Sequence, residues 1–164
     1  MTSCHELSRL RRCVLAGRRS RPAAAELAEV HQGSFGGLEE RLARDAQTVR
    51  SKLPANAEFA QIQGTPGWFY SFTCEFGERY VMFIYFFGSN YQVRVIEPEV
   101  EGKYSPHDGH LYADGRICFG TGGGMPTLES AYAKSVLWAN GFSAYKAAKL
   151  AGSPIPFPFS MNNS

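Results

Sequence analysis

The segment HLYADGRICFG, residues 110–120, holds the side chains best suited to covalent chemistry, a histidine at its start and a cysteine near its end. Cys118 lies in a predicted loop, after the turn-forming pair Asp114 and Gly115 and before a predicted helix. A thiol in such a position can be reached by a substrate and can act as a nucleophile. A histidine can donate an N–H or accept a proton near neutral pH. We therefore expect the chemistry at Cys118, with His110 beside it.

Other residues with reactive side chains fit structural or surface roles better. Cys74 lies in a strand-like run, where it can serve as a small hydrophobic residue. A metal site would have to use Cys4, His5 and Cys13, which lack a fourth ligand and the usual spacing. The glycine-rich residues 120–124 follow no strand and precede no Lys-Ser/Thr pair, so they predict a flexible lip beside the thiol rather than a phosphate loop. We expect no bound metal or nucleotide.

Four strands are predicted before this segment. Residues 68–76 alternate between aromatic or apolar and polar side chains, as in a half-buried strand. Residues 79–87 are almost continuously apolar, as in a central strand, and residues 91–97 form the next strand. A weaker strand is expected at residues 58–63. Because short turns join them, the four strands predict an antiparallel meander.

A helix is predicted on the amino-terminal side of the strands, where apolar residues recur at intervals of three and four until Pro54. These apolar residues are Leu38, Leu42, Ala46, Val49 and Leu53. The other face is basic and carries Arg41, Arg44, Arg50 and Lys52. Such a face is either solvated or a docking surface for a partner, and the sequence leaves both open.

Residues 98–125 lack periodicity, and a loop of this length usually has a function. Pro126 and Thr127 then open a helix that contains Trp138, a predicted core residue. Gly141 is expected to end this helix, with a shorter helix at residues 142–150. The domain organisation is therefore a flexible Arg-rich extension at residues 1–37, a catalytic domain at residues 38–152 and an extended Pro-rich tail at residues 153–164.

Composition excludes several classes of function. Hydrophobic content of 44% and charged content of 20% are those of a globular protein. Residues 1–21 hold six of the 17 basic and one of the 15 acidic residues, so the remainder is slightly acidic, with 11 basic and 14 acidic side chains. Such a domain offers little attraction to nucleic acid. No apolar run is long enough to cross a membrane, and we expect a cytoplasmic protein in a reducing compartment.

The order of elements and the string HLYADGRICF resemble the ubiquitin-conjugating enzymes, whose active-site segment runs His-Pro-Asn, a turn, and then Gly-x-Ile-Cys. Aligned on residues 115–118, the family's Asn falls on His110, its Pro on Gly109 and its His on Asp108. The resemblance implies an α+β ubiquitin-conjugating-like fold: an N-terminal helix, a four-stranded antiparallel meander, an irregular active-site crossing and C-terminal helices. It is specific only over residues 108–138. The missing His-Pro-Asn and the reduced carboxy-terminal helices resemble a divergent bacterial branch, found in conjugation and phage-defence operons.

The resemblance also implies an activity. Cys118 would accept a ubiquitin-like modifier from an activating enzyme as a thioester and pass it to an amine of a target protein. No cofactor is needed, since ATP is used by the activating enzyme. His110 would supply an N–H to the carbonyl oxygen in place of the family's Asn, act as a base, or brace the loop. The basic helix face at Arg41 and Arg44 would dock the activating enzyme.

Two further interpretations stay open at this point. The chain can be an inactive binding module of the same fold that recognises a ubiquitin-like protein or an activating enzyme. It can also be a cysteine hydrolase that uses Cys118 and His110. A hydrolase of this kind needs a carboxylate to orient the histidine, and only Asp108 or Asp114 is near in the sequence.

Overall fold

The computed structural model describes residues 35–104, 106–120, 123–153 and 155–157, and the chain forms two units, Met1–Ala43 and Arg44–Ser164. Helix α2, Phe35–Lys52, begins in the first unit and continues into the second. The predicted helix is therefore present, and it starts earlier than Leu38 because it includes Gly36 and Gly37, although glycine is a poor helix former. The predicted Arg-rich extension lies outside the described residues up to residue 34.

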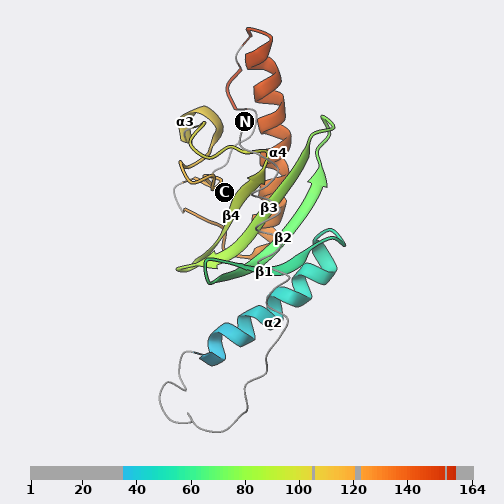
Figure 1. Cartoon of the computed structure of the whole chain (residues 1–164), viewed down its shortest axis with the longest axis vertical. Coiled ribbons are helices and arrows are strands. Elements are labelled where there is room, and N and C mark those ends of the chain that lie inside the picture. The colour runs from blue at the N-terminus through green and yellow to red at the C-terminus, as the bar shows by residue number, and fades with distance from the viewer. Residues whose placement is uncertain (1–34, 105, 121–122, 154, 158–164) are drawn as a thin grey trace. The chain divides into compact units, whose positions relative to one another are not determined.

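The predicted meander is confirmed. Strands β1 (Glu58–Ile62), β2 (Thr65–Thr73), β3 (Arg79–Phe87) and β4 (Asn90–Glu97) form one antiparallel sheet in the order β1-β2-β3-β4. Together with the helices they make a mixed α+β architecture (Figure 1).

The core lies between one face of the sheet and helix α4, Leu128–Leu150, which runs along that face (Figure 1). Trp138 and Phe142 of α4 are fully buried, and their rings stack at 4.6 Å. The side chains that the strands contribute are Tyr70, Tyr80, Met82, Ile84, Tyr91, Val93 and Val95. This confirms Trp138 as a core residue.

Helix α4 is one continuous helix, so the expected break at Gly141 was wrong. Gly141 is buried within it, between the fully buried Ala139 and Phe142. A glycine inside a helix costs about 1 kcal/mol relative to alanine. The burial of Trp138 and Phe142 outweighs that cost, since each aromatic side chain contributes about 2 kcal/mol or more. The predicted start is confirmed, because Thr127 caps the helix and forms a capping box with Ser130.

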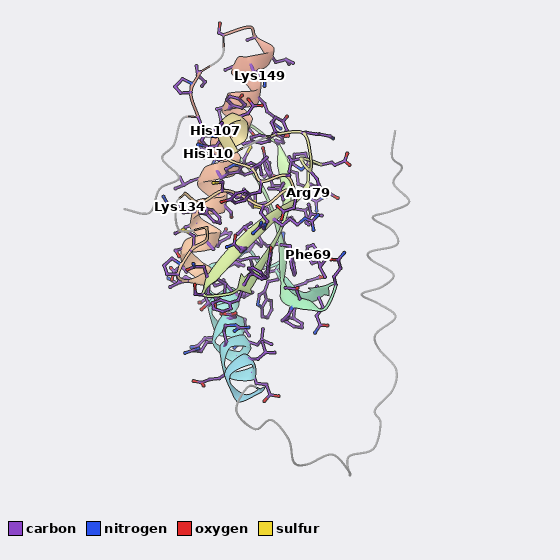
Figure 2. The ribbon with its side chains drawn as sticks, turned by 90° about the vertical axis from the view of Figure 1, so that its left-hand side faces the viewer. Phe69, Arg79, His107, His110, Lys134 and Lys149 are labelled. Carbon is purple, nitrogen blue, oxygen red and sulfur yellow. The ribbon has the colours of Figure 1, made fainter. Side chains whose placement is uncertain are left out.

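The opposite face of the sheet carries a second aromatic group. Figure 2 shows Phe69 on the side of the sheet away from α4. The Phe69 ring lies 4.9 Å from that of Phe83, its direct partner on β3. Gly67 makes room for this packing, because a Cβ there would lie 2.6 Å from the Phe83 ring.

The irregular crossing contains one short element, helix α3, Pro106–Gly109. The sequence did not predict it. The indole N–H of Trp138 donates to the carbonyl oxygen of Gly109 at 2.9 Å, which ties the end of α3 to the core helix. A Cβ on Gly109 would lie 3.1 Å from the Phe142 ring, so the close approach favours glycine. This contact sets the position at which the candidate active segment begins.

Candidate active site

Residues 110–118 form a small hairpin. Leu111 and Ile117 pair in antiparallel register, and the backbone N–H of Cys118 donates to the carbonyl oxygen of His110 at 2.7 Å. The turn closes with hydrogen bonds from Gly115 N–H to Tyr112 O and from Tyr112 N–H to Arg116 O, at 2.9 and 2.8 Å. Gly115 has a φ of 79°, which glycine adopts without strain. The expected turn at Asp114 and Gly115 is confirmed.

The hairpin is docked on the outer edge of β4. Ile117 N–H donates to Val93 O, and Val95 N–H donates to Gly115 O, both at 2.9 Å. Further along the edge, Tyr91 and Met125 exchange two backbone hydrogen bonds. The crossing thus covers a strand edge that would otherwise expose unpaired backbone groups. It also holds the cysteine segment against the sheet.

Side chains along the hairpin alternate between the interior and the surface. Leu111, Ile117 and Phe119 are fully buried. The residues between them, His110, Tyr112 and Cys118, are half-exposed. In an antiparallel pair, residues directly opposite each other project from the same face, and diagonal neighbours can touch. The register therefore puts Cys118 on one face with His110 opposite it and Tyr112 diagonal to it.

Tyr112 is the functional residue that sequence reasoning missed. Its hydroxyl lies near the thiol of Cys118, and the interaction with that thiol is the largest cause that raises the pKa of Tyr112, followed by burial. The guanidinium of Arg116 lies over the Tyr112 ring at 5.0 Å. The available signal was the spacing within the hairpin, because residues 112 and 118 become diagonal neighbours once Asp114 and Gly115 form the turn.

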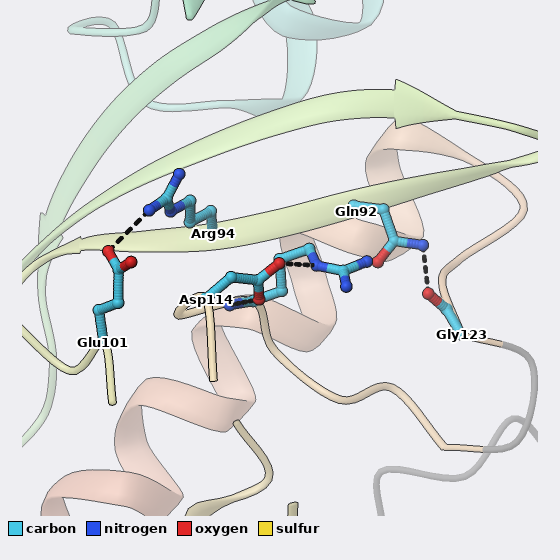
Figure 3. Close-up of polar contacts among 6 residues, drawn as sticks. Gln92, Arg94, Glu101, Asp114 and Gly123 are labelled. Atoms are coloured by element: carbon cyan, nitrogen blue, oxygen red, sulfur yellow. Dashed lines mark hydrogen bonds and ion pairs between the residues drawn. The ribbon is translucent and has the colours of Figure 1, made fainter. Parts of the chain in front are cut away.

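The charged side chains on this edge are engaged with each other (Figure 3). Asp114 forms an ion pair with Arg116 at 2.6 Å and also accepts the Arg116 backbone N–H at 3.1 Å. Arg94 pairs with Glu101 at 2.7 Å. Asp114 therefore braces the turn, as the sequence indicated, and its carboxylate is directed to Arg116 rather than to His110.

The glycine-rich lip is held more firmly than expected where the structure describes it. The amide nitrogen of Gln92 donates to the carbonyl oxygen of Gly123 (Figure 3). Gly124 is buried, and a Cβ there would lie 2.5 Å from the same amide nitrogen. Glycine is favoured at position 124 because another part of the chain approaches closely there, and not because the segment has to be flexible. Thr121 and Gly122 lie outside the described residues.

His110 has an unusual backbone and a largely apolar contact. Its φ is 50°, in the left-handed region that non-glycine residues seldom adopt. Its ring packs edge-on against the ring of Phe157, with centroids 4.7 Å apart. Burial lowers the pKa of His110, and the nearby His107 lowers it further. His107 and His110 lie close together beside α4 (Figure 2), and His107 is exposed.

Asp108, the other candidate to orient the histidine, is engaged elsewhere. It accepts a hydrogen bond from the hydroxyl of Tyr145 and pairs with Lys149 at 3.2 Å. These contacts lower the pKa of Asp108, with the Tyr145 hydrogen bond as the largest cause. Within the described part of the chain, the imidazole of His110 makes no hydrogen bond or ion pair.

In comparisons with known proteins, no family model, curated protein or solved structure matches the chain. Among the described residues, no helix is long and apolar enough to cross a membrane, and no group of three metal-binding side chains comes together. Cys4, His5 and Cys13 lie outside the described residues.

The basic face of α2 is less uniform than its sequence indicated. Arg44 is exposed and Arg41 is half-buried. Lys52 pairs with Glu129 of α4 at 3.1 Å, so this lysine is used within the protein. Arg41 belongs to the first unit and Arg44 to the second, and their expected role in binding a partner stays a prediction.

Proposed function

We propose that this chain is a thioester carrier of the ubiquitin-conjugating type, in which Cys118 carries the C-terminus of a ubiquitin-like modifier. One observation supports the proposal: the Cys118 thiol is half-exposed on a hairpin that is docked at the sheet edge. The Tyr112 hydroxyl lies near this thiol, and His110 lies opposite Cys118 on the hairpin. A thiol that exchanges acyl groups needs this combination of access and a fixed position.

The reaction has two steps. In the first, the Cys118 sulfur attacks the modifier's thioester on an activating enzyme, a new C–S bond forms, and the enzyme's thiol leaves. In the second, an amine of the target attacks the carbonyl carbon, a C–N bond forms, and the Cys118 sulfur leaves. The proton lost by the amine passes to solvent or to a nearby base. When the amine attacks, negative charge develops on the carbonyl oxygen, where a positioned N–H donor stabilises it.

His110 is the donor available to that oxygen. Its neutral form is favoured at neutral pH, because burial lowers its pKa. A neutral imidazole retains one N–H. A hydrolase, by contrast, uses a histidine base that a carboxylate orients, and both nearby carboxylates are engaged with other residues. This favours acyl transfer over hydrolysis.

The wider context belongs to the same proposal. The activating enzyme docks on α2 at Arg41 and Arg44, the target supplies the amine, and ATP is consumed by the activating enzyme alone. The protein acts in the bacterial cytoplasm, in a conjugation system of the kind used against phage. Substitution of Arg41 and Arg44 by Glu should slow loading and leave discharge to free lysine unchanged. Arg50→Glu is the matched control on the same helix.

The test of the carrier function is a non-reducing gel. Protein with Cys4→Ser and Cys13→Ser is incubated with ATP and an extract of the cells from which the gene derives. The proposal requires an adduct that reductant removes, and mass spectrometry should find Cys118 joined to the C-terminal residue of a small protein. Cys118→Lys should hold the same modifier through an amide that resists reductant.

Three results would contradict the proposal. An adduct that persists in Cys118→Ala rules out this cysteine as the acceptor, with Cys74→Ser as the matched control. Release of free modifier from a linear fusion, with no adduct, identifies a hydrolase. If neither adduct nor cleavage occurs while the modifier still binds the chain, the chain is the inactive binding module.

The role of His110 has a separate test. His110→Ala should load normally and discharge to lysine about 100-fold more slowly, because the donor matters most when charge appears on the oxygen. His110→Asn should recover part of the rate through its amide N–H. Discharge that falls with acidification like a histidine titration, after correction for lysine ionisation, identifies a base instead of a donor. Discharge of His110→Ala at the wild-type rate reduces His110 to a loop brace.

A further inference from the structure

The chain after α4 turns back toward the site. The end of α4 is closed by hydrogen bonds from Gly152 N–H to Lys149 O and from Ser153 N–H to Ala148 O, at 3.2 and 3.1 Å. Gly152 has a φ of 72°, the left-handed conformation that reverses the chain after a helix. Phe157 then lies against α4, where its ring is 6.4 Å from that of Tyr145, and against His110. A carboxy-terminal residue thus reaches the residue opposite Cys118.

The backbone and the ring of His110 are held by different contacts. The His110 backbone is fixed by its carbonyl, which accepts the Cys118 N–H at 2.7 Å. Its ring has no hydrogen-bonding or ionic partner in the part of the chain that the structure describes, and its ring contact is the edge-on packing of Phe157. Edge-to-face aromatic packing has a preferred geometry, so it restricts how the imidazole can turn.

We propose that Phe157 is a positioning residue of this site: its ring fixes the orientation of the His110 imidazole on the hairpin that carries Cys118. This inference rests on the proposed acyl transfer, and it adds a carboxy-terminal residue to the machinery. Phe157 acts through His110 and need not touch the substrate. The Phe157 ring would hold the His110 N–H in one direction. The direction of a donor decides how well it stabilises a developing charge.

The same contact limits the access of water to the imidazole. Among the described residues, the titratable groups near it are His107 of α3, which acts on it electrostatically, and Cys118, which lies opposite it on the hairpin. Asp108 of α3 is bound to Tyr145 and Lys149 of α4. Removing the Phe157 ring leaves these groups in place and exposes the imidazole. The pKa of His110 should then rise toward its ordinary value, because burial is the main cause of its depression.

The first experiment needs no modifier. The His110 ring signals are titrated by NMR in the unloaded full chain, for wild type, Phe157→Ala and Phe157→Tyr, with Ile155→Ala as a control in the same segment. We expect a higher His110 pKa in Phe157→Ala and a wild-type value in the other two. The far-ultraviolet spectrum and melting temperature show whether each variant folds. An unchanged His110 pKa in folded Phe157→Ala would overturn the proposal.

The second experiment measures the reaction with a chemical probe. Protein lacking Cys4 and Cys13 is loaded at Cys118 by exchange with N-acetylglycylglycine mercaptoethanesulfonate thioester, and discharge to free lysine is followed by intact mass. Phe157→Ala should load at the wild-type rate and discharge about tenfold more slowly, the effect of a misdirected donor. Phe157→Tyr should recover the wild-type rate, because it keeps an aromatic ring.

The outcomes separate the two proposals. Faster discharge in Phe157→Ala would show that the segment obstructs the site, which overturns the positioning role. If the His110 pKa rises but discharge is the same in Phe157→Ala and His110→Ala as in wild type, the ring contact is real and the imidazole has no part in transfer, so the positioning role fails. If wild-type protein never forms a modifier adduct in cell extract, the carrier function fails whatever the titration shows.

Discussion

Cys74 and Cys118 have the same side chain in two opposite environments. Cys74 follows β2, is 6% exposed, and lies 3.4 Å from the hydroxyl of Ser143. Cys118 is half-exposed and contacts the hydroxyl of Tyr112 on the outer edge of the sheet. Each sulfur therefore has one hydroxyl neighbour. The two sites differ in the residues that surround the thiol and its hydroxyl neighbour, and these residues decide whether a reagent can reach the thiol.

The hydroxyl next to Cys74 belongs to a closed polar cluster. Ser143 donates to the carboxylate of Glu78 at 2.6 Å, and Tyr80 donates to the same carboxylate at 2.9 Å. Lys146 forms an ion pair with Glu78. Burial opposes the ionisation of Glu78, but the hydrogen bonds from Lys146, Ser143 and Tyr80 outweigh it and lower the pKa of the carboxyl. The cluster satisfies its own members, which is the pattern of a structural network.

The largest expected difference between Cys74 and Cys118 is in thiol reactivity in the folded protein. With Cys4 and Cys13 replaced by Ser, 5,5′-dithiobis(2-nitrobenzoate) should modify Cys118 about 1000-fold faster than Cys74, because Cys74 reacts only after local opening of the core. Cys118→Ala should remove the fast phase and Cys74→Ala the slow one. Equal rates for the two thiols in native protein would contradict the distinction.

The second prediction concerns stability. Ser143→Ala should lower the free energy of unfolding by about 1–3 kcal/mol, because it removes the hydroxyl that hydrogen-bonds with both Tyr80 and Glu78 inside the cluster. Urea unfolding measures the change. Ser51→Ala, the same substitution at an exposed position of helix α2, should change stability by less than about 0.5 kcal/mol. A similar loss in both variants would mean that the cluster around Cys74 contributes nothing specific.

The third prediction is a dependence on pH. The pKa of Glu78 is lower in the folded protein than its ordinary value of about 4.3, so its contribution to stability is complete above that value. The contribution is lost as the pH falls through the folded value. The difference in unfolding free energy between wild type and Glu78→Gln should therefore shrink from pH 6 to pH 3. Glu75→Gln, an exposed carboxylate of the same turn, should give a difference that does not vary with pH in this way.

The smallest expected effect is at Cys118 itself. Tyr112→Phe removes the hydroxyl and keeps the ring under Arg116. Thiol reactivity near neutral pH should fall about threefold, because the sulfur loses the polar hydroxyl beside it. The rate of labelling measures this, and Tyr104→Phe is a control elsewhere on the crossing. Faster labelling would show that the hydroxyl shields the thiol from the reagent instead of assisting its reaction.

Much of the fold was predictable because local pattern and burial agree. Alternating side chains at residues 68–76 and a continuous apolar run at residues 79–87 predicted the central strands, and Pro126 and Thr127 marked the start of α4. The predicted helix end at Gly141 was wrong, because the low helix propensity of one glycine is a smaller effect than the packing of Trp138 and Phe142.

The candidate site was predictable only in part. The positions of Cys118 and of the turn at Asp114 follow from local signals. The contact between Tyr112 and the thiol requires the hairpin register, and the contact between Phe157 and His110 joins segments far apart in the sequence. No periodicity reports contacts of this second kind. The engagement of Asp108 with Tyr145 is hidden for the same reason.

The docking of the hairpin on β4 also determines the order in which the site forms during folding. The hairpin around Asp114 and Gly115 closes between near neighbours in the sequence, and such loops form within microseconds. Its hydrogen bonds to Val93 and Val95 span the whole crossing, and contacts of long sequence separation form late. Cys118 therefore meets Tyr112 before it reaches its place on the sheet edge. In a nascent chain, the Cys118 thiol and the Tyr112 hydroxyl would come together first, and the complete site would form only at the end of folding.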